Sequence, residues 1–165
     1  MKNIKTKLPY IIGLVISVLG LLSMLFAYFV TTGGPNMGFN AYQLLSLSSL
    51  GFWWVLLCIF HVLMITLFII TIVICTLKLL DETGILTFKI TFRKVTSFLV
   101  LKCLLILLTA ISVVEMFLTW FLILANGDFG LVFGAGTFVL IGILLIGYVV
   151  FLFLERNDYF NKDQE

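Results

Sequence analysis

The chain has 165 residues, of which 62% are hydrophobic and only 11% are charged, and its net charge is +2. Its mean hydropathy of +1.26 excludes a soluble globular domain, in which about half of the residues are apolar. The basic residues lie beside apolar runs and form no dense patch, which excludes a nucleic-acid-binding surface. We therefore expect one integral membrane domain over residues 1–165, with no room for a separate soluble domain.

The first apolar run, residues 9–30, is long enough as a helix to cross a hydrocarbon layer of about 30 Å. Small residues recur in it at steps of four, three and seven positions, which places them on one helix face. Small side chains let two helix backbones approach closely, although glycine is also simply common in membrane helices. We predict that this face packs against a neighbouring helix; its members are Gly13, Ser17, Gly20 and Ala27.

The second and third apolar runs, residues 51–77 and 96–125, are longer than one straight crossing requires. Trp53 near the start of the second run and Trp120 near the end of the third mark one membrane interface, because tryptophan prefers that depth. Lys102 lies near the other end of the third run, where its long side chain is expected to reach the lipid headgroups.

The fourth apolar run, residues 130–154, begins with two glycines four positions apart, Gly130 and Gly134. This spacing is typical of closely packed membrane helices, so we predict a second packing face here. The four runs together predict an all-α fold, an integral membrane bundle of four transmembrane helices.

The basic residues indicate how this bundle is oriented. Successive crossings place alternate connections on the same side of the membrane. All ten Lys and Arg residues lie beside or between the apolar runs on one such side, namely Lys2, Lys5, Lys7, Lys78, Lys89, Arg93, Lys94, Lys102, Arg156 and Lys162. The two remaining connections, residues 31–50 and 126–130, contain none. Because basic loops stay in the cytoplasm, the pattern predicts that both termini are cytoplasmic.

Two ionisable residues lie deep inside apolar runs, His61 in the second and Glu115 in the third. Each is ten residues, or about 15 Å, from the tryptophan-marked end of its run. A charge at the centre of the hydrocarbon costs about 2.5–3.5 kcal/mol on insertion scales, so we expect the two groups to pair. The pair is either a proton-responsive or ion-binding site, or a neutral hydrogen-bonded contact that fixes helix register.

The sequence carries no pattern that is typical of an enzyme. It has a single His, and no His, Cys or carboxylate spacing suited to zinc. It also has no nucleophile with an obvious base and no glycine-rich phosphate loop. We therefore expect a non-enzymatic protein without a cofactor or a bound metal.

Two segments carry a resemblance to a known family. The run Leu-Lys-Leu-Leu-Asp-Glu-Thr-Gly-Ile-Leu-Thr-Phe at 77–88 leads into Phe-Arg-Lys-Val at 92–95, and Asn-Gly-Asp-Phe-Gly-Leu at 126–131 precedes the final run. This layout resembles the small four-span bacterial membrane proteins of the YoaS type, although the tail lacks that family's longer acidic ending. The resemblance implies a location in a bacterial plasma membrane and the role of an accessory protein encoded near a small helix-turn-helix regulator, with no established activity.

Two classes of function follow from these observations. The first is a membrane protein that acts through helix–helix or lipid contacts, such as an accessory, immunity or signalling subunit, with a second copy or another membrane protein as partner. The alternative is a small oligomeric transporter or channel whose polar lining includes His61 and Glu115.

Overall fold

The computed structural model describes residues 2–31, 38–40, 51–85, 97–125 and 131–156. Within these residues it contains four helices, which are α1 (Lys2–Ser23), α3 (Phe52–Glu82), α5 (Phe98–Ala125) and α6 (Ala135–Arg156). The prediction of a mainly helical fold is confirmed, and α3, α5 and α6 are each long and apolar enough to cross a membrane. The apolar part of α1, Lys7–Ser23, is shorter.

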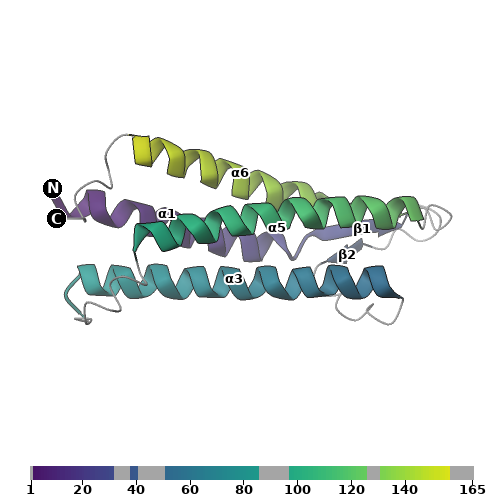
Figure 1. Cartoon of the computed structure of the whole chain (residues 1–165), viewed down its shortest axis with the longest axis horizontal. Helices are drawn as coiled ribbons and strands as arrows, with labels where there is room; N and C mark the ends of the chain where they lie inside the picture. The colour runs from purple at the N-terminus through teal and green to yellow at the C-terminus, as the bar shows by residue number, and fades with distance from the viewer. Residues whose placement is uncertain (1, 32–37, 41–50, 86–96, 126–130, 157–165) are drawn as a thin grey trace.

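The four helices run side by side along the long axis of the molecule (Figure 1). Both α1 and α5 pack against α3 and α6. α1 and α5 start at the end of the bundle where α3 and α6 finish, so each of them is antiparallel to α3 and to α6 (Figure 1). The start of α1 and the end of α6 therefore lie at the same end of the bundle.

The first apolar run does not continue as a helix over residues 9–30, which corrects the sequence prediction. α1 ends at Ser23, whose hydroxyl donates a 2.7 Å hydrogen bond to the carbonyl of Gly20. Turn hydrogen bonds follow directly, and the chain then enters strand β1, Ala27–Thr31. The segment 28–31 reads Tyr-Phe-Val-Thr, and aromatic and β-branched residues favour strands.

A small antiparallel sheet lies in the half of the bundle opposite to the start of α1, where β1 runs along the bundle axis (Figure 1). β1 is its central strand, with β2 (Gly38–Asn40) on one side and β3 (Leu131–Phe133) on the other. In the register, Val30 pairs with Gly38 of β2 and with Val132 of β3. Because β3 occupies the start of the fourth apolar run, α6 begins at Ala135, later than the predicted residue 130.

The bundle is apolar both inside and outside. Its core holds large side chains from all four helices, among them Ile16, Phe68, Leu108 and Leu144. Its outer surface is also covered by apolar side chains, for example Ile69, Phe117 and Ile146. Exposed apolar surface on this scale is typical of a protein whose solvent is lipid.

Candidate functional site

The structure brings His61 of α3 and Glu115 of α5 together inside the bundle. His61 Nδ1 lies 3.4 Å from Glu115 Oε1, and the two side chains are 0% and 2% exposed. The contact joins neighbouring antiparallel helices at the same depth. Because both groups are enclosed by their own chain, neither side chain faces the lipid.

The imidazole is held in place by its own helix. His61 Nδ1 lies 2.9 Å from the carbonyl oxygen of Leu57, one turn earlier in α3. A carbonyl oxygen only accepts hydrogen bonds, so this contact assigns the proton of the neutral ring to Nδ1. The 3.4 Å separation from Glu115 Oε1 is long for a hydrogen bond. The positive edge of the imidazole nevertheless faces the carboxyl group.

The Glu115 carboxyl group forms no hydrogen bond with any residue that the structure describes, at either oxygen. The same holds for the buried hydroxyl oxygens of Thr119 on α5 and Thr137 on α6. Buried polar oxygens are normally paired, because an unmet hydrogen bond costs about 1–3 kcal/mol. Ser17 Oγ on α1 is a fifth such oxygen among the described residues, and the four on α5 and α6 together need a physical explanation.

These oxygens lie at a similar depth. Thr119 follows Glu115 by four residues on α5, so the two side chains lie on the same face of the helix. The contact of Lys102 with Glu155 and the ring stacking of Phe98 on Phe151 set the register of α5 against α6. Counted from these contacts, residue 115 lies opposite residues 134–142, which include Thr137. We call His61, Glu115, Thr119 and Thr137 the polar layer.

The two threonines of this layer were missed in the sequence. A threonine in a membrane helix commonly satisfies its hydroxyl on the carbonyl four residues earlier. Thr71 and Thr109 do so, with hydrogen bonds of 2.8 Å to Leu67 and Leu105. The four-residue spacing of Thr119 from Glu115 could have indicated that both side chains lie on one helix face. The sequence around Thr137 contains no comparable indication.

Part of the predicted small-residue face lies against α3. A Cβ added to Gly13 would lie 3.1 Å from Cys75 Sγ, and one added to Gly20 would overlap the ring of Phe68. Ser17 is completely buried between these two glycines. Close approach of α1 and α3 therefore depends on the missing side chains at Gly13 and Gly20.

The other small residues singled out in the sequence have different positions. Ala27 belongs to β1 and not to a helix. Gly134 is buried in the connection between β3 and α6, so it does not belong to a helix face. Gly130 lies outside the described residues.

The sequence predicted that the Lys102 side chain reaches the lipid headgroups, and the structure shows that it also binds a residue of the protein. Its Nζ donates hydrogen bonds of 2.6 and 2.8 Å to the two carboxylate oxygens of Glu155 on α6. The side chains are 28% and 41% exposed. This pair marks the end of the bundle that carries the basic residues, whereas the polar layer lies toward the sheet.

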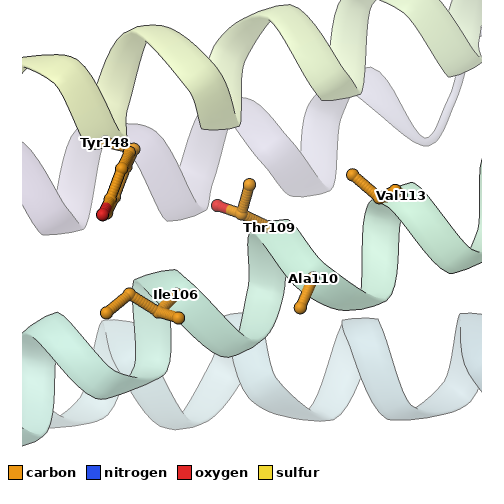
Figure 2. Close-up of a pocket in the computed structure, with 5 residues that line it drawn as sticks. All are labelled: Ile106, Thr109, Ala110, Val113 and Tyr148. Carbon is orange, nitrogen blue, oxygen red and sulfur yellow. The ribbon is translucent and has the colours of Figure 1, made fainter.

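A shallow groove of about 400 Å³ runs along the surface between α5 and α6. Figure 2 shows Tyr148 reaching from α6 toward α5 across this groove. Its α5 side is formed by Ile106, Thr109, Ala110 and Val113. No hydrogen bond joins the Tyr148 hydroxyl to the part of the chain that the structure describes.

Comparisons with protein-family models, with curated proteins and with solved structures found no match to this chain. Among the described residues, no three His, Cys, Asp or Glu side chains are grouped in a way that would hold a metal ion.

Proposed function

We propose that this chain is a non-enzymatic multi-pass membrane protein that acts by binding a transmembrane helix of a partner in the groove between α5 and α6. Such a protein is an accessory, immunity or signalling subunit. In this proposal both termini are cytoplasmic and the membrane is a bacterial plasma membrane. The observation that carries the proposal is the position of the Tyr148 hydroxyl in that groove.

The depth of Tyr148 is the first step of the argument. It precedes Glu155 by seven residues on α6, and Thr109 follows Lys102 by seven residues on α5. Both are therefore about 10 Å from the Lys102–Glu155 pair along the helix axis. Trp120, which prefers the interface, lies about 16 Å further along α5 from Thr109. Tyr148 thus lies inside the hydrocarbon, about 10 Å from the Lys102–Glu155 pair.

The chemistry of the groove is the second step. A tyrosine hydroxyl belongs at the membrane interface, and in hydrocarbon it requires a hydrogen-bond acceptor. Lipid tails supply none, whereas the backbone carbonyls or polar side chains of another helix do. Ala110 and Thr109 are small, so a second helix backbone can approach them closely. A transmembrane helix therefore satisfies both the shape of the groove and its hydroxyl.

The experiment is site-specific photo-crosslinking in intact cells that express the full chain. A benzoylphenylalanine residue at Ala110 should yield one discrete adduct, and the same residue at Ile69, on the exposed face of α3, should yield none. Tyr148→Phe should weaken the Ala110 adduct. An adduct of twice the 18.6 kDa chain mass identifies a second copy as the partner. Equal labelling from Ala110 and Ile69 would contradict the proposal.

The alternative function, an oligomeric transporter, draws less support from the same observations. His61 and Glu115 are enclosed within one chain, so a path between copies would not be lined by them. A transport function would need a path through the interior of a single bundle, at the polar layer.

We also propose kinship with the YoaS type of small membrane protein. This proposal rests on the layout of residues 77–95 and 126–131. The accessory role that the resemblance implies agrees with the function proposed above.

A further inference from the structure

The polar layer carries an inference that is independent of the groove. Four buried oxygens belong to it, namely both carboxylate oxygens of Glu115 and the hydroxyl oxygens of Thr119 and Thr137. They come from two helices that pack against each other. None of the four forms a hydrogen bond with a described residue.

The charges around Glu115 are the next consideration. The described titratable groups at this depth are His61 and Cys58, both on α3. α1 contributes only Ser23 as a polar side chain near this level, and α6 contributes Thr137. The basic side chains of the described helices lie toward the opposite end, where Lys102 is engaged by Glu155. No described Lys or Arg therefore neutralises the Glu115 carboxylate.

We propose that the polar layer binds a dehydrated monovalent cation of the size of sodium, held by the Glu115 carboxylate and by the hydroxyl oxygens of Thr119 and Thr137. Oxygen ligands favour hard cations over transition metals. A single carboxylate balances one positive charge, whereas divalent sites usually collect several carboxylates. The ion removes the penalty of a lone buried carboxylate and supplies the missing partner to both hydroxyls.

The position of the layer determines the side from which the ion enters. Thr119 is six residues from the end of α5, a distance of about 9 Å, and Thr137 lies in the first turn of α6. Thr119 lies one helical turn closer than Glu115 to the end of the bundle that carries the sheet. The shortest route to the site therefore begins at that end. His61 acts as a positioning residue, because its ring faces Glu115 Oε1 and is fixed by Leu57.

The test is thermal unfolding of the full chain in detergent, in sodium chloride or in N-methylglucamine chloride at equal ionic strength. Sodium should raise Tm in a saturable way, by about 3–6 °C at ten times Kd. The rise should shrink at lower pH, because protons compete with sodium for the carboxylate. Glu115→Gln and Thr119→Val should abolish the sodium-specific rise, and Thr119→Ser should retain it.

The matched control is Thr71→Val, which removes a buried hydroxyl that already bonds its own helix and lies outside both the layer and the groove. It should leave the sodium-specific rise unchanged. Equal Tm values in both salts, or an undiminished rise in Glu115→Gln, would overturn the proposal and leave the layer to a proton or to bridging water. Should Glu115→Gln fail to fold, the comparison of Thr119→Val with Thr119→Ser decides. Crosslinking at Ala110 does not depend on either result, so the two proposals fail separately.

Discussion

Phe68 of α3 packs directly against the Cα of Gly20 on α1, and its ring occupies the space where a side chain at residue 20 would lie. Phe68 is completely buried, and because protein interiors are close-packed, displacing its ring is costly. The contact between α1 and α3 is therefore one of backbone against ring. It makes residue 20 sensitive to the addition of even one methyl group.

We predict that Gly20→Ala destabilises the bundle by about 1–3 kcal/mol, because the added methyl group overpacks the interface with Phe68. Gly20→Leu should be worse. The matched control is Gly142→Ala on α6, where an added Cβ meets nothing within 4 Å. Unfolding in detergent measures both, and Phe68→Leu should partly rescue Gly20→Ala. Equal losses in Gly20→Ala and Gly142→Ala would refute this account of the interface.

The second prediction concerns the stability of the polar layer without sodium. In sodium-free buffer Glu115→Gln should be at least as stable as the wild type, because it removes a buried carboxylate that no described basic residue balances. A double-mutant cycle with His61→Asn should give a coupling energy of about 0.5–3 kcal/mol, since the two side chains are in contact. Strong destabilisation by Glu115→Gln together with zero coupling would show that the carboxyl group has another partner.

The third prediction locates the membrane interface on the bundle. A double-mutant cycle of Lys102→Met and Glu155→Gln should give a coupling energy of no more than about 1 kcal/mol, because the pair is partly exposed. The coupling should weaken as salt is added to protein in lipid nanodiscs. A coupling well above about 2 kcal/mol that is insensitive to salt would place the pair inside the hydrocarbon.

Hydropathy was sufficient to predict α3 and α5 to within a few residues, apart from the longer end of α3. A long apolar run has few alternatives to a helix when its solvent is lipid. The same reasoning failed after Ser23, because an apolar run does not by itself distinguish a helix from a strand. What makes residues 27–31 a strand is pairing with β3, about one hundred residues later in the chain. A single sequence does not display such a distant contact.

The sequence predicted only part of the candidate site. Counting residues from the ends of two antiparallel runs was enough to place His61 opposite Glu115, because a helix advances by a fixed rise per residue. Thr119 and Thr137 were missed, because a hydroxyl in a helix usually bonds its own backbone. Only the packed structure separates Thr71, which does so, from Thr119, which does not.

The central claim is that this chain crosses the membrane repeatedly and holds the end with the basic residues in the cytoplasm. The most direct measurement is labelling of single cysteines with an impermeant thiol reagent in intact cells, after replacement of the native cysteines Cys58, Cys75 and Cys103. A cysteine at Asp128, between α5 and β3, should react from outside. A cysteine at Thr83, just after α3 at the basic end, should react only after the cells are opened. Labelling of the Thr83 position in intact cells would contradict the account.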